Sequence, residues 1–121
     1  MSLTPTILAH VTDRPVSPGG FALVVHFWLL PGAAAAFDAL VAGTLEQIRA
    51  HEPGTLVYAV HTMAGDPTLR VFYELYRDRA AFDAHEDQPH VRAFLAARGQ
   101  YLRGVDVEFL DLSGGARVGA G

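Results

Sequence analysis

The side chains best suited to acid–base chemistry lie between positions 69 and 102. Glu74 and Tyr76 alternate there with apolar residues, and His85 and His90 follow along the chain. Imidazole exchanges protons near neutral pH. A carboxyl group among apolar residues must be hydrogen-bonded or have a raised pKa. We therefore expect a small-molecule site in this stretch, with Glu74 as a candidate catalytic residue.

The two histidines do not have the spacing of a metal site. Zinc-protease histidines lie four positions apart on one continuous helix, whereas His85 and His90 are five apart with Pro89 between them. The chain has no cysteine, so thiolate ligands are absent as well. We predict no metal and no cofactor. Either histidine could instead bond backbone groups at a helix end.

Changes in hydrophobic period predict the elements that position these residues. Two-residue alternation or short apolar runs predict strands at 21–30, 55–62, 69–76 and 105–112. Helical spacing predicts a helix at 33–51, a short helix from 79 to about 87, and another opened by Pro89. This β-α-β-β-α-β order is typical of ferredoxin-like α+β folds. We predict a four-stranded antiparallel sheet with the helices on one face.

Helices on one face leave the other face of the sheet without cover. Alternate positions of the two predicted central strands are apolar. A bare face would expose on the order of 1,000 Å² of apolar surface, more than a monomer usually tolerates. We therefore expect a homodimer in which a second copy covers the face that the helices leave bare.

Composition limits what the whole chain can be. Its 121 residues suffice for one domain, placed at 21–112 between an N-terminal arm (1–20) and a flexible tail (113–121). The arm is expected to add a short strand around 6–11. A formal charge of −4, with nine arginines and no lysine, predicts no nucleic-acid surface.

The same composition bears on where the chain acts. No apolar run approaches the roughly eighteen residues of a bilayer span, so no membrane partner is expected. The first residues show no signal-peptide pattern. Together with the lack of cysteine, these features predict a cytoplasmic protein.

Several short motifs follow one another in a fixed order. They are Pro31-Gly32, Glu52-Pro53-Gly54-Thr55, Glu74-Leu75-Tyr76, Asp78, Ala81, His85, Pro89-His90 and Phe94. Their order and spacing resemble the antibiotic biosynthesis monooxygenase domain family over about 21–112. The resemblance implies a dimeric α+β barrel, in which each subunit keeps a pocket between its sheet and helices. It also implies oxygenation of polyphenols, quinols or anthrone-like aromatics without metal or flavin.

The resemblance assigns side chains to this pocket. Positions 26 and 76 match pocket positions of a related haem-degrading branch. Phe72, Glu74 and Tyr76 are thus expected to face the helices, with His26 and Trp28 beside them. His26 is then the candidate base and Glu74 its partner. The structural alternatives are a core histidine, a packed tryptophan and a buried ion pair.

Further residues complete the predicted substrate site. Tyr58 is expected to form part of the wall from the second strand, and Phe94 from the last helix. By resemblance, His85 and His90 are expected near the pocket mouth.

The sequence is compatible with two functions. The leading one is cofactor-independent oxygenation of a small electron-rich aromatic, quinol or polyketide-type substrate. A deprotonated phenol can itself give an electron to O₂, so the protein needs a base, a dry pocket and groups that hold the anion. The alternative is a non-catalytic small-molecule-binding protein. Haem binding or degradation is disfavoured, because the branch's axial histidine falls at Phe94 or Leu95 and its asparagine has no counterpart.

Overall fold

A computed structural model of the protein describes residues 19–116. The strands are β1 (Phe21–Leu29), β2 (Thr55–Met63), β3 (Asp66–Tyr76) and β4 (Leu102–Asp111). The helices are α1 (Ala34–His51), α2 (Arg79–Asp87) and α3 (Pro89–Ala97), and a 3-10 turn, η1 (Arg98–Tyr101), leads into β4. All the elements predicted within 21–112 are present. The strand predicted around 6–11 lies outside the described residues.

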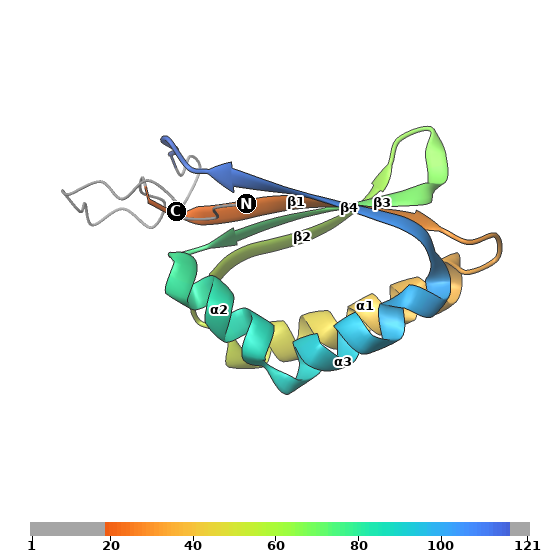
Figure 1. Cartoon of the computed structure of the whole chain (residues 1–121), viewed down its shortest axis with the longest axis horizontal. Coiled ribbons are helices and arrows are strands. Elements are labelled where there is room, and N and C mark those ends of the chain that lie inside the picture. The colour runs from red at the N-terminus through yellow and green to blue at the C-terminus, as the bar shows by residue number, and fades with distance from the viewer. Residues whose placement is uncertain (1–18, 117–121) are drawn as a thin grey trace.

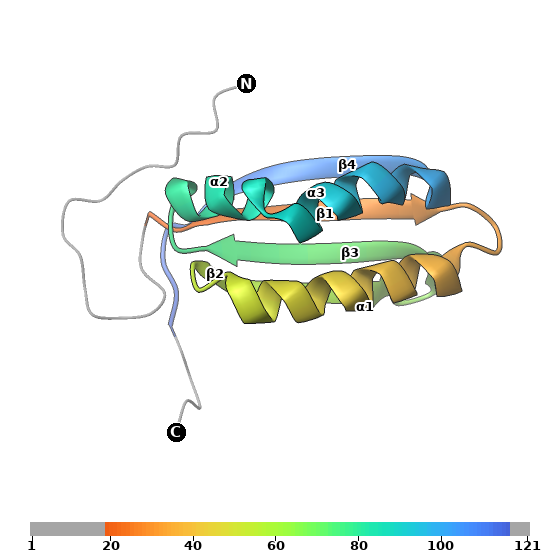
Figure 2. The same cartoon turned by 90° about the horizontal axis from the view of Figure 1, so that it is seen from below.

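The four strands form one antiparallel sheet in the order β2-β3-β1-β4. All three helices lie on one side of it, with α1 running alongside the α2–α3 pair (Figures 1 and 2). This confirms the predicted ferredoxin-like arrangement. β1 and β3 lie at the centre, where their side chains are more deeply buried than those of the edge strands β2 and β4.

Strand register decides which side chains face the helices. In the β1–β3 pair, Leu23 lies opposite Glu74 and Val25 lies opposite Phe72. Directly opposed residues point to the same face of a sheet. Odd-numbered positions of β1 therefore share the helix side with even-numbered positions of β3. Buried side chains of this layer form the core together with Phe37 and Val41 from α1 and Phe94 from α3.

Local sequence signals fix the ends of the two short helices. The Asp78 carboxylate accepts the backbone N–H of Ala81 at 2.8 Å and caps α2. α3 begins at Pro89, whose missing N–H is not needed in a first turn. Gln88 between them has an extended backbone (φ −66°, ψ 140°), so α2 and α3 are separate helices. This break places His85 and His90 on different helices.

The chain passes very close to α2 just before β2 begins. A Cβ atom at Gly54 would lie 2.7 Å from the Cβ of Ala81, which is closer than two non-bonded carbon atoms normally approach. Glycine at position 54 therefore allows α2 to lie this close to the chain before β2.

The face of the sheet opposite the helices carries a mixed surface. Val24, Trp28, Val71 and Tyr73 of the central strands are half-buried there, with His26 among them. No helix within residues 19–116 covers this face (Figure 1). None of the helices in this part of the chain combines the length and the hydropathy needed to cross a bilayer.

Candidate active site

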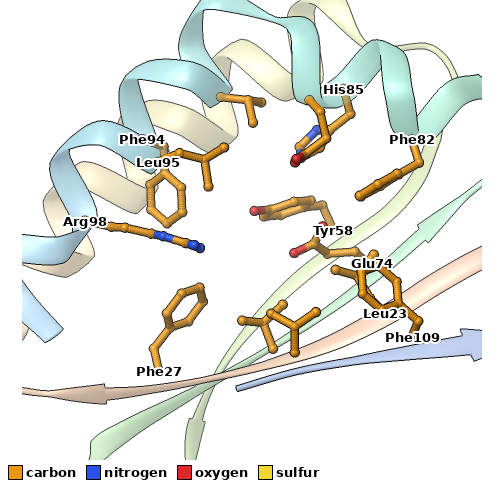
Figure 3. Close-up of a pocket in the computed structure, with 14 residues that line it drawn as sticks. Leu23, Phe27, Tyr58, Glu74, Phe82, His85, Phe94, Leu95, Arg98 and Phe109 are labelled. Atoms are coloured by element: carbon orange, nitrogen blue, oxygen red, sulfur yellow. The ribbon is translucent and has the colours of Figure 1, made fainter. Parts of the chain in front are cut away.

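A cavity of about 140 Å³ lies between the sheet and the α2–α3 pair (Figure 3). Its wall is largely apolar and includes the rings of Phe27, Phe82, Phe94 and Phe109. A cavity of about 150 Å³ lined by apolar side chains accommodates a benzene ring. The space therefore fits one aromatic ring.

The cavity opens toward solvent between the α2–α3 pair and β4. Glu86, Leu95 and Val107 line it and are exposed, which marks this rim as the mouth. A ring inside can thus carry a substituent that extends into water.

Glu74 projects from β3 into the cavity and is 5% exposed. The Tyr76 hydroxyl donates a 2.5 Å hydrogen bond to its Oε1. Burial raises the pKa of Glu74 to about 7, although the bond from Tyr76 opposes the shift; the charge of Glu86 adds to it. The site therefore holds a carboxyl group that titrates near neutral pH.

Tyr58 lies opposite Glu74 on the neighbouring strand β2 and lines the cavity. Burial raises the pKa of Tyr58 well above its usual value, and the charge of Glu74 raises it further. Its hydroxyl is consequently a neutral donor and acceptor within the cavity.

Arg98 brings a positive charge to the cavity. Its guanidinium carbon lies 5.5 Å from the Phe27 ring centre and 5.9 Å from that of Phe94. In Figure 3 the side chain reaches in from the α3 side, toward Tyr58 and Glu74. Within residues 19–116 it has neither a hydrogen bond nor an ion pair. A guanidinium that packs on aromatic rings and keeps its N–H donors available is suited to bind an anionic oxygen.

A buried carboxylate behind the cavity joins two histidines. Glu52 Oε1 accepts hydrogen bonds from His85 Nδ1 at 2.6 Å and from Thr55 Oγ1 at 2.7 Å. Glu52 Oε2 meets His90 Nε2 at 2.5 Å. The side chains of Glu52, His85 and His90 are 3%, 4% and 10% exposed. We call Glu52, Thr55, His85 and His90 the Glu52 cluster.

The structure brings four of the predicted site residues together. Glu74, Tyr58, His85 and Phe94 line the same cavity. Phe72 is fully buried, packs against the rings of Tyr58 and Phe94, and supports the wall without lining it.

Two other predicted residues are linked to the cavity through hydrogen bonds without lining it. Tyr76 is fully buried and reaches the cavity through its bond to Glu74. His90 is connected through Glu52 and does not line the cavity.

The prediction that His26 and Trp28 share this cavity is wrong. His26 lies opposite Val71 and Asp106, and Trp28 lies opposite Leu69, all on the sheet face away from the helices. The prediction paired even positions of β1 with even positions of β3. The observed register pairs even with odd, so both side chains point to the other face.

On that outer face, His26 lies close to two carboxylates of β4. Donor atoms of His26, Asp106 and Glu108 are within 4.8 Å of one another. Among the residues that the structure describes, buried Nδ1 of His26 has no hydrogen-bond partner, and the His26 ring stacks on Trp28. His26 therefore cannot reach a substrate in the cavity of its own chain.

Sequence reasoning missed Arg98 and Glu52. Arg98 follows the last apolar turn of α3, where an arginine usually serves only the helix end. Glu52 belongs to one of the family motifs, but a lone acid after a helix gives no sign of its partners. Both needed the tertiary structure to be recognised.

The cavity does not offer the haem ligand of the related branch. The positions matching its axial histidine hold Phe94, a buried ring, and Leu95, an exposed aliphatic side chain. The histidine in the wall, His85, already has Nδ1 bound to Glu52. The residues present do not fit haem in the manner of that branch.

Solved structures of several bacterial proteins resemble this fold. A candidate antibiotic biosynthesis monooxygenase from Caulobacter crescentus has a TM-score of 0.76 and 26% identity, covering 80% of this chain and 92% of its own. For Rv0793 from Mycobacterium tuberculosis the TM-score is 0.74 and the identity 30%, over 81% and 99%. For PA3566 from Pseudomonas aeruginosa the values are 0.72 and 26%, over 81% and 97%.

The sequence comparison agrees with these structural likenesses. No curated protein matches the chain. The sequence model of the family described as "Antibiotic biosynthesis monooxygenase" matches residues 20–97. These residues span β1 to α3 and therefore most of the cavity wall. The chain belongs to the antibiotic biosynthesis monooxygenase family.

Proposed function

We propose that this protein is a cofactor-independent monooxygenase of single-ring, electron-rich phenols and quinols. The observation that carries the proposal is the composition of the cavity. It is the size of one aromatic ring and combines an apolar wall rich in phenylalanine with ionisable groups, Glu74 and His85, and with the Arg98 guanidinium, which has no hydrogen bond or ion pair within residues 19–116. These are the groups needed to bind a phenol, remove its proton and hold its anion away from water.

The proposed reaction needs only substrate and O₂. With hydroquinone, C₆H₆O₂ and O₂ give hydroxybenzoquinone, C₆H₄O₃, and H₂O. The substrate loses four electrons, two to the inserted oxygen atom and two in passing from quinol to quinone. O₂ takes up all four, one of its atoms enters the product and the other leaves as water.

Each cavity group has a part in this proposal. Arg98 holds the phenolate oxygen through charge-assisted hydrogen bonds, which stabilises the anion that gives an electron to O₂. Tyr58 and protonated Glu74 donate to the second ring oxygen. The phenylalanine rings exclude water and stack against the substrate.

The proposal includes a homodimer in the cytoplasm. The outer face of the sheet has half-buried Val24, Trp28, Val71 and Tyr73, which a second copy would cover. Packing there would leave the cavity mouth open, because the mouth lies between the α2–α3 pair and β4 on the helix side.

Oxygen uptake by purified protein without added cofactor tests the proposal. Hydroquinone, catechol and pyrogallol should each be tried, with ¹⁸O₂ and mass spectrometry of the product. We expect substrate-dependent uptake and one ¹⁸O atom per product molecule. Binding of these compounds without any uptake would leave the chain as a binding protein.

A further inference from the structure

Packing alone does not account for the Glu52 cluster. A buried carboxylate loses its water and must be compensated by hydrogen bonds. Apolar residues of similar size at positions 52, 85 and 90 would join α1, α2 and α3 without that cost. Yet the Glu52 side chain is 3% exposed and has three hydrogen-bonding partners. Polar side chains that converge on an apolar cavity are the usual mark of a binding or active site, and His85 lines this cavity.

The cluster fixes the tautomer of His85. With Glu52 ionised, Nδ1–H of His85 donates to Oε1, so Nε2 carries the lone pair. The His85 side chain lies in the cavity wall (Figure 3). Its ring centre is 5.6 Å from that of Tyr58 and 5.0 Å from that of Tyr76. Nε2 is therefore the nitrogen that a bound molecule can meet.

We infer that His85 is the catalytic base of this site and that Glu52, itself held by His90, is its positioning residue. The inference rests on the proposed oxygenation of a phenol. Carboxylates hold catalytic histidines in one tautomer and stabilise their charged form in the same way. Here the carboxylate has a second imidazole on its other oxygen, which fixes its orientation.

The proton steps balance with the proposed reaction. His85 Nε2 takes the phenolic proton, and the anion reacts with O₂ to form a peroxide on the neighbouring ring carbon. The imidazolium then protonates the outer peroxide oxygen. Neutral His85 next removes the proton from that ring carbon as a C=O bond forms and the O–O bond breaks. It delivers this proton to the departing hydroxide, which leaves as water.

Several titratable groups face His85 and its partners. They are Tyr58, Glu74 and Tyr76 from the sheet, Glu52 and His51 from the end of α1, Glu86 from α2, and His90 and Arg98 from α3 and η1. Any of them can shape a pH profile. Each variant is therefore compared with wild type over the whole profile.

Kinetics with hydroquinone test the assignment. His85→Ala should lower kcat by about 10²–10⁴-fold, the usual loss of a general base, with little change in KM. Added imidazole should restore part of the kcat that His85→Ala loses. Glu52→Gln should lower kcat by about 10²-fold or more and move the acid limb of the pH profile. Glu46→Gln, an exposed acid of α1 paired with Arg49, is the matched control and should match wild type.

A second measurement does not depend on turnover. In ¹⁵N NMR spectra of the wild-type protein, His85 should show the tautomer with Nδ1–H and a bare Nε2. Adding 4-nitrocatechol under argon should convert it to the imidazolium as the ligand ionises. In Glu52→Gln the starting tautomer should be mixed.

The outcomes separate this inference from the proposed function. Oxygen uptake with wild-type kcat in His85→Ala would overturn the role of His85 and leave the oxygenase proposal standing. A His85 spectrum that ligand binding does not change would also overturn it. Absence of uptake in the wild type, with His85 protonated by the bound ligand, would instead reject the oxygenase and retain His85 as the proton acceptor.

Discussion

The Tyr76 hydroxyl donates a 2.5 Å hydrogen bond to the Glu74 carboxyl group, two residues back along β3 in the cavity wall. Tyr76 is fully buried and Glu74 is 5% exposed, so water does not compete for this bond. Burial raises the pKa of Glu74 to about 7 despite the bond, and raises the pKa of Tyr76 as well. The pair therefore remains protonated well above the pH at which an exposed glutamate ionises.

The first prediction concerns Glu74 and the pH dependence of stability. The folded chain keeps the Glu74 proton up to about pH 7, whereas the unfolded chain releases it near 4.5. The folded state binds more protons in this window, so its stability falls as pH rises from about 4.5 to 7. Glu74→Gln should remove this loss, which amounts to about 3 kcal/mol at pH 8. Urea unfolding at pH 5 and pH 8 measures it, with Glu46→Gln as the control. Parallel pH dependences in wild type and Glu74→Gln would contradict it.

The second prediction concerns Arg98 and the bound anion. 4-Nitrophenol should bind as its coloured phenolate, with an apparent pKa below that of the free compound. Arg98→Gln should weaken phenolate binding about tenfold or more, because a charged hydrogen bond is lost. Arg98→Lys should be intermediate, since it keeps the charge and loses the planar fork. Spectrophotometric titration measures this. The matched control is Arg92→Gln, an exposed arginine of α3 paired with Asp87; a similar loss there would count against a specific site at Arg98.

The third prediction concerns His26. Because its side chain lies on the outer face of the sheet, His26→Ala should keep oxygen uptake close to wild type. His85→Ala, measured beside it, should not. A loss in His26→Ala of the 10²-fold or more expected for a general base would show that this residue acts in catalysis after all.

The fourth prediction concerns the contact between Gly54 and Ala81. Gly54→Ala would place two Cβ atoms 2.7 Å apart, and should cost about 1–3 kcal/mol of unfolding free energy through overpacking. The double variant Gly54→Ala/Ala81→Gly should recover part of the loss, less what glycine costs in the α2 helix. Thermal and urea unfolding of the four proteins form a double-mutant cycle. Additive effects would mean that the two sites do not touch.

The fifth prediction concerns assembly through the outer face of the sheet. Wild-type protein should sediment at twice the 13.0 kDa mass of the chain. Val71→Asp would place an unpaired carboxylate in the proposed interface and should give monomers or insoluble protein. Ala42→Asp adds the same charge at an exposed position of α1 and should remain dimeric. A monomeric wild type at micromolar concentration would rule out the interface.

The sequence by itself determined the order of the elements and the family. Hydrophobic period depends on local spacing, so strands and helices could be assigned from it, and Pro89 was enough to separate α2 from α3. Four cavity residues, Tyr58, Glu74, His85 and Phe94, were also predicted.

Only the tertiary structure decided which face His26 occupies and which groups converge. The hydrophobic period of a strand shows which side chains share a face, but the hydrogen-bonded register decides which faces of two strands coincide. The observed register differs by one residue from the predicted one, so His26 lies on the outer face and not in the cavity. Glu52 and His85 are 33 residues apart, and their contact follows from how α1 and α2 pack on the sheet. Arg98 likewise acquires its place from the rings of Phe27 and Phe94. Contacts between distant segments leave no local pattern, because no periodicity in one segment encodes what packs against it.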